Sequence, residues 1–494
     1  MKKILDSVHG YVEIPDEIVD NIVDTVYFQR LRRIEQTSGR SIFPSARHDR
    51  FIHSIGVYSL GVRIVDSIYN HYLQIFPDYK IYNSVIFSYT IACLLHDVGH
   101  TPFSHTFESY YDVPENGIKA TLIKLVREYD PDFENDFNKN FQDAAPHEII
   151  SAIISVKIFG DFIKSYHDYF YNGAYGDCAL VARMIVGCKY TDKSKSFHNV
   201  FIELLHSKIL DADSLDYVSR DAWASGYLSS KVDTVRLLNS ITLHVDSDGK
   251  YSLCYDIKAI NEIRAALHVK NFQQENVINH HTVVYEQTLL KRAMESVAAL
   301  SETGRETSSP SERKKYLGKI CNLTGFLGEL DEGDLMNFPT DDFFICRMRA
   351  HPNNRYVREW FSRQYYLKPL WKSRERFWLY FRKFNFKELT PECWLYSNGC
   401  KKYLSEKYNI NIDDIWIENG TPKNKMATLS DLKILINDQL INYTHLFSLD
   451  ALAQQELLTC FKFIYIPPVD NNDNELDFEE IRKDLVKEFF TNIH

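Results

Sequence analysis

Apolar residues in the N-terminal part of the chain recur at helical spacing. From Pro15 to Ile34 they follow the i, i+3, i+4, i+7 pattern of one amphipathic helix, with the proline at a first-turn position. A second helix is predicted from about Ser54 to His71, with its apolar residues on one side. Residues 82–97 are apolar nearly all round, which predicts a helix in the core. Further helical patterns cover residues 147–159, 198–216 and 257–300.

Strand signals are sparse in the same region. The stretch "ITLHVDSDGKYSLCYD" alternates apolar and polar positions on both sides of a turn that contains Asp248 and Gly249, and this pattern predicts a β-hairpin. The expected fold class is therefore mostly α, with a small β-hairpin beside a helical core.

Changes in composition predict three regions. Residues 1–300 form the expected core, the polar, Ser/Thr-rich stretch 301–320 a loop or linker, and residues 321–494 a C-terminal α(+β) lobe with a regulatory or oligomerisation role. Residues 355–387 mix basic and aromatic side chains. Such a mixture can bind nucleic acid by charge and stacking, or the aromatic rings can pack while the arginines face solvent or pair with acids.

Composition favours a soluble protein of the cytoplasm. With 494 residues, 45% of them hydrophobic, the chain can bury a large core. A formal net charge of −10 argues against a surface coated with nucleic-acid-binding charge. The nine cysteines form no C-x-x-C pair, as is typical of reduced thiols. We expect no signal peptide and no membrane segment, since no apolar run reaches about 18 residues.

The stretch "LLHDVGHTPFSH" places histidines and an aspartate directly after an apolar helix. His96 and His100 share one helix face, and Asp97 adjoins them. A lone histidine there would be an ordinary core residue, but several imidazoles and a carboxylate together lose too much hydration to be buried without compensation. A divalent iron, manganese, zinc or nickel ion would provide it, because these metals bind imidazole and carboxylate. His53 and Asp213 are further ligand candidates.

The ordered set of these residues in a helical chain resembles the HD-domain phosphohydrolases, and the surrounding residues narrow the likeness to the HD-domain deoxynucleoside triphosphate triphosphohydrolases. That family includes bacterial enzymes and a vertebrate enzyme that also carries a sterile-alpha-motif domain. The likeness covers roughly residues 1–300 and continues faintly through "FPTDDFFICRMRA" and "LKPLWK". The motifs that carry it are "DSVHGYVEIP", "DTVYFQRLRRIEQTSG", "FPSARHDRFIHSIGV", "LLHDVGHTPFSH", "HEII" and "DADSLDYVSRDAWASG".

The resemblance implies an HD-domain fold and one metal site. Its ligands would be His53, His96, Asp97 and Asp213. Such a set leaves coordination positions for a water and a phosphate oxygen. In the family the water attacks the α-phosphorus, the bond to the 5′ oxygen breaks, and deoxynucleoside and tripolyphosphate leave. A Mg²⁺ ion accompanies the triphosphate, and Arg50 matches a phosphate-contacting arginine.

Three more histidines complete the implied catalytic group. We expect His105 to be the general acid for the leaving 5′ oxygen, with Glu108 orienting it. His147 is the other candidate for the acid, and His100 can donate a hydrogen bond to phosphate. Two alternatives stay open: the three histidines hold a second metal, as in two-metal HD phosphodiesterases, or His147 alone caps a helix at the surface.

The resemblance also implies a deoxyribose site. Gln36, Tyr217 and Asp221 match family residues there, where an amide and a carboxylate can hold the 3′-hydroxyl and a tyrosine ring can crowd the 2′ carbon. Lys270 is a candidate replacement for a nearby arginine of the family.

Three further positions either differ from the family or fit more than one interpretation. Ser214 stands where the vertebrate enzyme has a lysine that contacts triphosphate, and Ile278 replaces a tyrosine beside the base. Because a site with fewer cations holds a triphosphate less tightly, a less charged nucleotide is an alternative substrate. Asp216 fits either this site or a solvated helix face.

A regulatory likeness lies near the N-terminus. Asp24, Gln29 and Arg32 match guanine-reading residues of an activator site in the vertebrate enzyme, and Lys2 and Lys368 fall roughly where its basic residues lie. The alternative is that the same trio only pairs within a helix bundle. A GTP or dNTP activator at such a site would lie between subunits, which implies a homo-oligomer, a dimer or a tetramer, whose assembly is linked to nucleotide binding.

The predicted function is metal-dependent hydrolysis of dNTPs, used in dNTP-pool control or phage defence. Two other classes remain. A nuclease or phosphodiesterase would keep the metal chemistry but needs a basic groove, which the acidic balance disfavours. A non-catalytic nucleotide sensor is disfavoured because every metal ligand is present.

Overall fold

The structure is a computed structural model in which the chain divides into two compact units. The first comprises Met1–Lys270, Glu295–Ala350 and Ala427–Phe447. The second comprises Asn271–Met294, His351–Met426 and Ser448–His494. The described residues are 1–72, 79–114, 117–140, 144–168, 173–207, 210–226, 232–301, 317, 321–323, 326, 339–381, 398–420, 432–437, 439–443 and 461–490.

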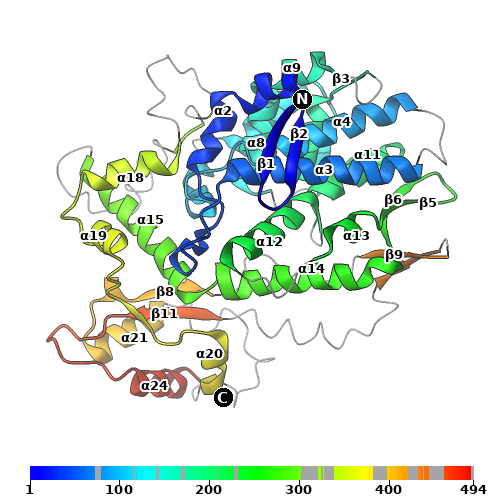
Figure 1. Cartoon of the computed structure of the whole chain (residues 1–494). Helices are drawn as coiled ribbons and strands as arrows, with labels where there is room; N and C mark the ends of the chain where they lie inside the picture. Colours follow the sequence, from blue (N-terminus) through cyan, green and yellow to red (C-terminus); the bar gives the residue numbers. More distant parts are fainter. Residues whose placement is uncertain are drawn as a thin grey trace. The chain divides into compact units, whose positions relative to one another are not determined.

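The first unit begins with a hairpin that the sequence pattern did not predict. Strands β1 (Lys2–Asp6) and β2 (Gly10–Ile14) pair antiparallel (Figure 1). Gly10 has a φ of +77°, a left-handed conformation that glycine adopts at little cost. The motif "DSVHGYVEIP" therefore forms the turn and the second strand of this hairpin.

The single helix predicted from Pro15 to Ile34 is wrong, because the segment is broken at Thr25. The backbone of Thr25 is extended, and its hydroxyl accepts a hydrogen bond from the amide of Phe28 and so caps a new helix. The break turns Val26 toward solvent, with 46% of its surface exposed. The segment consists of α1 (Asp16–Ile18), the π-helix η1 (Val19–Val23), α2 (Val26–Gln29) and the 3₁₀ helix η2 (Arg30–Arg33).

Long apolar helices form the core of the first unit, as predicted. Helix α3 (Arg50–Tyr72) buries the apolar side of the predicted second helix, and α4 (Tyr79–Leu95) is buried on every side from Val85 to Leu95. Helices α8 (Pro146–Lys157) and α10 (Cys178–Val186) pack against each other and against α4. These helices enclose α4, at whose end the histidine motif begins.

The longer predicted helices are each interrupted. Residues 198–216 divide into α11 (Ser196–Leu205) and α12 (Ala212–Ser225), because Asp211 and Ser214 form a capping box that starts a new helix. The 257–300 pattern divides into α14 (Ile260–Gln273), the π-helix η8 (Gln274–Ile278) and α15 (His281–Ser301). The ring of His280 accepts a hydrogen bond from the amide of Thr282 at the second break. Periodicity alone did not reveal these caps.

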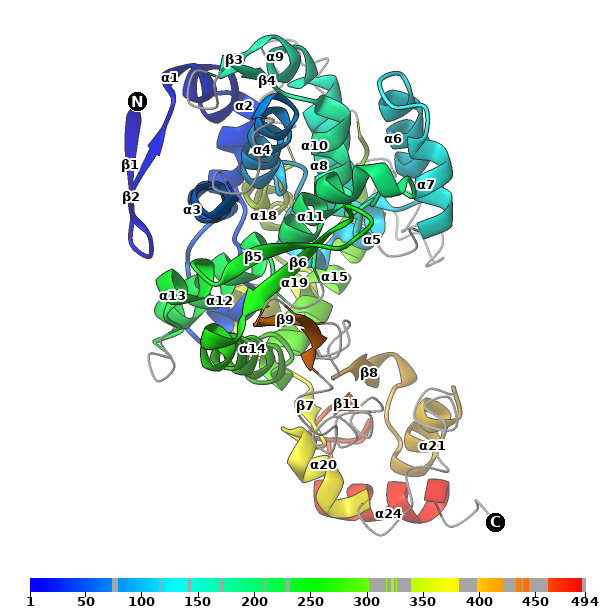
Figure 2. The same cartoon turned by 90° about the vertical axis from the view of Figure 1, so that its right-hand side faces the viewer.

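The predicted β-hairpin is confirmed as part of a larger sheet. Strands β5 (Ile241–Val245) and β6 (Tyr251–Asp256) pair antiparallel, and β9 (Lys433–Ile436) pairs parallel to β6. Adding β10 (Gln439–Asn442) gives the order β10-β9-β6-β5, and Figure 2 shows β5, β6 and β9 side by side. Because a late segment joins an early sheet, the compact units differ from the contiguous boundaries expected from composition. Most of the predicted linker 301–320 lies outside the described residues.

The second unit has its own core around the sheet β7-β11-β8. Trp371 and Trp416 are almost fully buried in it, together with Phe377, Phe463 and Tyr465. Where the 355–387 region is described, its aromatic rings thus mostly pack in this core, and Arg355 pairs with Asp414 while Arg374 pairs with Glu275. The elements are α19 (Arg355–Ser362), β7 (Lys368–Pro369), α20 (Arg374–Phe381), α21 (Asn398–Tyr408), β8 (Trp416–Asn419), β11 (Lys462–Ile466) and α24 (Phe478–Phe490).

Shorter elements complete the described chain, which is mostly α as predicted. None of the described helices is both long and apolar enough to cross a bilayer. The remaining elements are η3 (Ser38–Ser41), η4 (Ser104–Thr106), α5 (Glu108–Tyr111), α6 (Ile118–Arg127), α7 (Phe133–Asn140), α9 (Gly160–Ser165), β3 (His167–Asp168), β4 (Ala174–Tyr175), η6 (Lys193–Lys195), α13 (Thr234–Leu238), η7 (Ile257–Ala259), α18 (Asp341–Arg349) and η10 (Ile412–Asp414).

Candidate metal centre and active site

The predicted metal ligands converge from three helices of the first unit. His53 lies on α3, His96 and Asp97 follow the last turn of α4, and Asp213 lies in the first turn of α12. Nε2 of His53 lies 3.0 Å from Oδ1 of Asp213 and 3.6 Å from Oδ2 of Asp97. Nε2 of His96 lies 3.7 Å from Oδ1 of Asp97 and 3.8 Å from Oδ1 of Asp213.

The orientation of the two imidazoles fits a metal cation. Nδ1 of His53 lies 2.6 Å from a carboxylate oxygen of Asp216, and Nδ1 of His96 lies 2.9 Å from the carbonyl oxygen of Cys93. Both partners are acceptors, so each neutral ring keeps its proton on Nδ1 and turns the Nε2 lone pair inward. These two Nε2 atoms lie 3.2 Å apart, a contact between acceptors that a cation or an added proton must relieve.

The pKa of His53 reflects the same arrangement. Although burial alone would lower it, hydrogen bonds to Asp213 and Asp216 raise the pKa of His53 to about 9. The site therefore favours positive charge. The ligand atoms of His53, His96 and Asp213 lie within 4.8 Å of one another, and this set of two imidazoles and a carboxylate fits a divalent metal, whereas Asp97 lies beside the group and is bonded to Arg50.

A buried ion network that the sequence did not reveal supports His53 from behind. Asp216 is fully buried and accepts hydrogen bonds from Nε and Nη2 of Arg220, both at 2.8 Å, as well as contacting His53. Nε2 of His9, in the β1–β2 turn, lies 2.6 Å from Asp216, and Arg220 also donates to Asp6 at 2.7 Å. The interpretation of Asp216 as part of a solvated helix face is wrong, because this residue belongs to the shell that orients a ligand.

Arg50 lies against the metal site rather than in solvent. Its side chain donates to Asp97 at 2.6 Å, to the hydroxyl of Ser104 at 3.1 Å and to the carbonyl oxygen of Gln36 at 3.2 Å. Although burial would raise it, the charge of Arg50 and the neighbouring imidazoles hold the pKa of Asp97 well below its usual range. Asp97 is therefore ionised and fixed by Arg50. Within the described residues, the contacts of Arg50 use three of its five N–H groups, so two can serve another acceptor.

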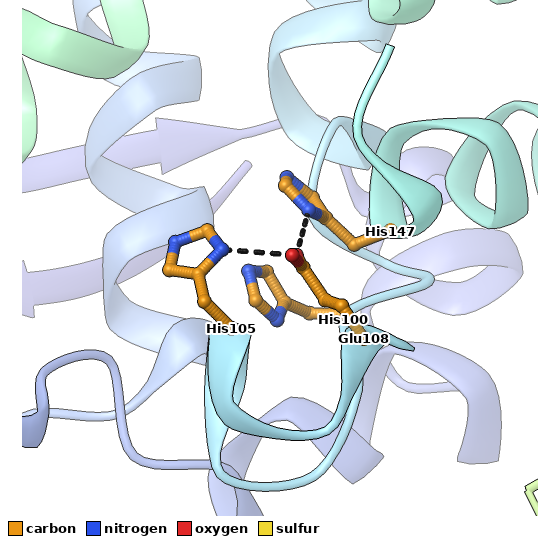
Figure 3. A group of neighbouring side chains, drawn as sticks. All are labelled: His100, His105, Glu108 and His147. Atoms are coloured by element: carbon orange, nitrogen blue, oxygen red, sulfur yellow. Dashed lines mark hydrogen bonds and ion pairs between the residues drawn. The ribbon is translucent and has the colours of Figure 1, made fainter. Parts of the chain in front are cut away.

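A second group of histidines surrounds Glu108. Oε1 of Glu108 lies 2.9 Å from Nδ1 of His105 and 2.5 Å from Nδ1 of His147 (Figure 3). His100 stacks on His147 with ring centroids 4.3 Å apart. One ligand atom from each of these side chains lies within 4.8 Å of the others, so the geometry also permits a cation there. The predicted catalytic group is thus brought together in one place.

The members of this group differ in charge. Burial would raise the pKa of Glu108, but the two histidines hold it well below its usual range. Burial would lower the pKa of His147, but Glu108 raises it to about 9. Burial, with the charge of Arg50, instead lowers the pKa of His100 well below its usual range. Neither ring nitrogen of His100 has a hydrogen-bond partner among the described residues. The group therefore combines a charged imidazole with a neutral one, and His147 is buried rather than a surface cap.

The residues expected near the sugar lie on α12 and on the segment before α3. Asp213, Tyr217 and Asp221 repeat every four residues of α12 and so share one face. Asp221 accepts a hydrogen bond at 2.7 Å from His48, a residue that the sequence did not suggest. Oε1 of Gln36 is buried without a partner in the part of the chain that the structure describes.

The other positions singled out from the sequence lie beside residues outside the predicted sugar site. Tyr217 packs against Val218 and Val269, and the charge of Lys270 acts on Asp211, the residue that caps α12. Ser214 donates to the carbonyl oxygen of Asp211 within the same cap. Ile278 ends the π-helix η8, which belongs to the second unit.

The predicted activator residues of the first unit form one chain of contacts. Lys2 donates to Asp24 at 2.8 Å, Gln29 donates to Asp24 at 3.5 Å, and Arg32 donates to Gln29 at 2.8 Å. Lys368 belongs to the second unit, where it donates to the carbonyl oxygen of Tyr365. Lys2, Asp24, Gln29 and Arg32 therefore pair with one another. This pairing is also what the alternative interpretation requires, in which these residues only stabilise the helix bundle.

Several known proteins with similar sequences are named as phosphohydrolases of this kind. A model of the HD domain matches residues 50–167. The chain is 30% identical over 280 residues to the "Deoxynucleoside triphosphate triphosphohydrolase SAMHD1 homolog" of Dictyostelium discoideum, which covers 56% of this chain and 46% of that protein. It is 31% identical over 245 residues to the uncharacterized protein YwfO of Bacillus subtilis, covering 48% of this chain and 43% of that one. The chain thus spans about half the length of the curated relatives it matches.

Solved structures share the fold. A phosphohydrolase from Bacteroides thetaiotaomicron superposes with a TM-score of 0.63 at 18% identity, covering 94% of this chain and 100% of that one. A hypothetical protein from Aquifex aeolicus gives a TM-score of 0.54 at 20% identity, covering 98% and 99%. The chain therefore carries an HD domain at residues 50–167, and its relatives at about 30% identity include proteins named deoxynucleoside triphosphate triphosphohydrolases.

Proposed function

We propose that this protein is a metal-dependent hydrolase that converts dNTPs to deoxynucleosides and tripolyphosphate. The observation that carries the proposal is the pair of adjoining groups: the inward-facing Nε2 atoms of His53 and His96 with the carboxylate of Asp213, and the histidine pair on Glu108. Hydrolysis of a phosphate ester needs an activated water on one side of phosphorus and a proton for the leaving oxygen on the other. Several relatives are named deoxynucleoside triphosphate triphosphohydrolases.

The residues divide the proposed reaction between them. A divalent metal held by the His53 group would polarise a phosphate oxygen and lower the pKa of a bound water. His105 is the proposed general acid, since Glu108 orients its ring through Nδ1 and its side chain is 58% exposed, within reach of a substrate. His147 shares the same carboxylate and is the other candidate for the general acid, while neutral His100 can donate one hydrogen bond to a phosphate oxygen.

Arg50 and the face of α12 would bind the substrate. Arg50 keeps two N–H groups for a phosphate oxygen beyond its three contacts with the protein. The Oε1 of Gln36, which has no partner among the described residues, can accept the proton of the 3′-hydroxyl, and the carboxylate of Asp221 is the alternative acceptor for that proton. Tyr217 is proposed to crowd the 2′ carbon, and Lys270 to add positive charge for the triphosphate, which Mg²⁺ would accompany.

A second metal at Glu108 is the alternative chemistry for the histidine pair. The ligand atoms of His100, His105, Glu108 and His147 lie close enough for one ion. Metal analysis after loading and desalting separates the two forms, because the general-acid proposal requires one transition-metal ion per chain and the alternative requires two.

Activation by a nucleotide is proposed for the Lys2, Asp24, Gln29 and Arg32 group, with Lys368 as a further cation. The four side chains present an acid, an amide and two cations in one contact chain, as a guanine base and its phosphates require. Binding there between subunits would favour a dimer or tetramer. If Arg32→Ala removes stimulation by GTP and nucleotide-dependent assembly but leaves basal hydrolysis, the proposal holds; unchanged stimulation refutes it.

Product analysis tests the proposed reaction. Metal-loaded protein is incubated with each dNTP and each rNTP, singly and in mixtures, and the products are separated by chromatography. We expect nucleoside and tripolyphosphate from dNTPs alone. Asp213→Asn is the matched inactive variant, because the side chain of Asp213 is 39% exposed and, within the described residues, forms ion pairs only with the two histidine ligands.

The outcomes separate the candidate classes. Release of monophosphate or pyrophosphate would replace the proposed reaction with another phosphohydrolase activity. Degradation of single-stranded DNA with intact dNTPs would favour the nuclease alternative. If every substrate survives with each metal and each mixture, the proposal fails and a nucleotide sensor becomes the better interpretation.

A further inference from the structure

The loop that carries the proposed general acid has an unusual backbone. Phe103 and Ser104, directly before His105, both have a φ of +52°. Residues other than glycine rarely adopt this left-handed conformation, and two in succession persist only where surrounding contacts enforce it. The position and the orientation of the His105 side chain therefore depend on the contacts that stabilise this turn.

The same turn also touches Arg50. The hydroxyl of Ser104 accepts a hydrogen bond from Nε of Arg50 at 3.1 Å and donates to the carbonyl oxygen of Glu35 at 2.5 Å. Arg50 in turn donates to Asp97. A shift of this turn would move both the proposed acid and the arginine beside the metal ligand.

Asp341 is the side chain that fastens the turn. Its Oδ1 accepts from the amide of Phe103 at 2.6 Å, and its Oδ2 accepts from the amide of Glu35 at 2.9 Å. The two carboxylate oxygens thus link the two backbone segments that meet at Ser104. Asp341 is only 6% exposed and begins α18, more than two hundred residues after the loop in sequence.

Arg30 fastens the segment that carries Asp341 to the same loop. Its buried guanidinium donates to the carbonyl oxygens of Val98, His100 and Pro339 at 2.8, 2.9 and 2.7 Å. The segment before α18 and the histidine motif therefore share one cation as well as one carboxylate. The described part of "FPTDDFFICRMRA" lies at this contact.

We propose that Asp341 is a positioning residue for catalysis: it holds the Phe103–Ser104 turn in its left-handed form so that His105 and Arg50 face the substrate. Only an ionised carboxylate offers two acceptors to two N–H groups. Burial raises the pKa of Asp341 to about 7, so the form with both bonds prevails above neutral pH. The catalytic consequence rests on the proposed function, whereas the fastening of the turn does not.

Asp341→Asn is the decisive variant, because it keeps the shape of the side chain but replaces one acceptor by a donor. The neighbouring Asp342→Asn is the matched control, since Asp342 is exposed and, in the part of the chain that the structure describes, pairs only with exposed Arg33, at 3.4 Å. Two properties are measured at pH 8: hydrogen–deuterium exchange of the peptide spanning the turn, and kcat and KM for dNTP hydrolysis. Thermal unfolding and bound metal are checked for each variant.

We expect Asp341→Asn to raise amide exchange in the turn at least tenfold and to lower kcat by roughly 10- to 100-fold, since small misplacement of a catalytic group costs about that much. Metal content and the exchange of α8 should stay near wild type, and Asp342→Asn should change neither these properties nor the exchange of the turn, kcat or KM. If Asp341→Asn does not fold, Asp341→Ser, which keeps one acceptor, takes its place.

Unchanged exchange in the turn, or raised exchange with unchanged kcat, would overturn the inference. If the wild-type protein hydrolyses no dNTP, the proposed function fails, and exchange alone then decides whether Asp341 fastens the turn. A loss of activity shared equally by Asp342→Asn would also refute a specific role for Asp341.

Discussion

Removing the carboxylate behind His53 should weaken metal binding without removing any ligand. Asp216→Asn preserves the shape of the side chain but takes away the charge that accepts the Nδ1 proton of His53 over 2.6 Å. The ligand ring then loses both its fixed tautomer and part of its basicity. Asp216 is therefore a direct test of whether the buried network serves the metal site.

The expected magnitude follows from the contacts. Loss of an outer-shell partner lowers metal affinity by about 10- to 100-fold, which corresponds to about 1.4–2.8 kcal/mol. The same change leaves buried Arg220 with Asp6 as its remaining carboxylate partner among the described residues. Breaking a buried ion pair costs about 3–5 kcal/mol, so lower stability of the folded protein must be separated from weaker metal binding.

Asp6→Asn provides that separation. Asp6 is as deeply buried as Asp216 and belongs to the same network, but it contacts Arg220 and backbone amides rather than the histidine ligand. Metal affinity is measured by competition with a coloured chelator, and folding by thermal unfolding of the metal-free proteins. We expect both variants to be destabilised but only Asp216→Asn to lose affinity at least tenfold. Equal affinities for Asp216→Asn and wild type would refute the assigned role.

Three further outcomes follow from the geometry. His105→Gln should lower kcat by about 10²- to 10⁴-fold with little change in bound metal, and a rate within threefold of wild type would remove His105 as the acid. Because the folded pKa of His147 lies at about 9, above its ordinary value, the stability that it adds is complete below about pH 6.5 and lost as the pH rises through 9. The difference in melting temperature between wild type and His147→Gln should therefore shrink from pH 6.5 to 9, and a constant difference would contradict the shift. Gly56→Ala should destabilise the fold by about 1–3 kcal/mol in denaturation experiments, since a Cβ atom there would lie 2.1 Å from Oδ1 of Asp216, and an unchanged melting temperature would contradict this packing.

Sequence pattern was sufficient for the parts of the fold that depend on continuous periodicity. Helix α3 and the β5–β6 hairpin were predicted because their apolar faces repeat without interruption. The helix predicted from Pro15 failed because one threonine hydroxyl caps a new helix, an effect worth about 1 kcal/mol that periodicity does not register. The pairing of β9 with β6 joins segments far apart in the chain, and no local pattern encodes it.

Some residues of the candidate site could be predicted from the sequence, and others could not. His53, His96 and Asp213 were identifiable as ligand candidates because imidazole and carboxylate in a buried helical setting need compensation. Asp216 and Asp341 gave no comparable signal, since an aspartate in a polar stretch looks like a solvated residue until its partners are known. Their roles come from Arg220, Phe103 and other groups that only the fold brings near.

The destination of the solvent oxygen tests the central proposal most directly. Metal-loaded protein is incubated with a dNTP in H₂¹⁸O, and the products are analysed by mass spectrometry beside the Asp213→Asn variant. Attack of water on the α-phosphorus with cleavage of the bond to the 5′ oxygen predicts ¹⁸O in tripolyphosphate and none in the nucleoside. Label in the nucleoside, or in a monophosphate or pyrophosphate product, would contradict the account.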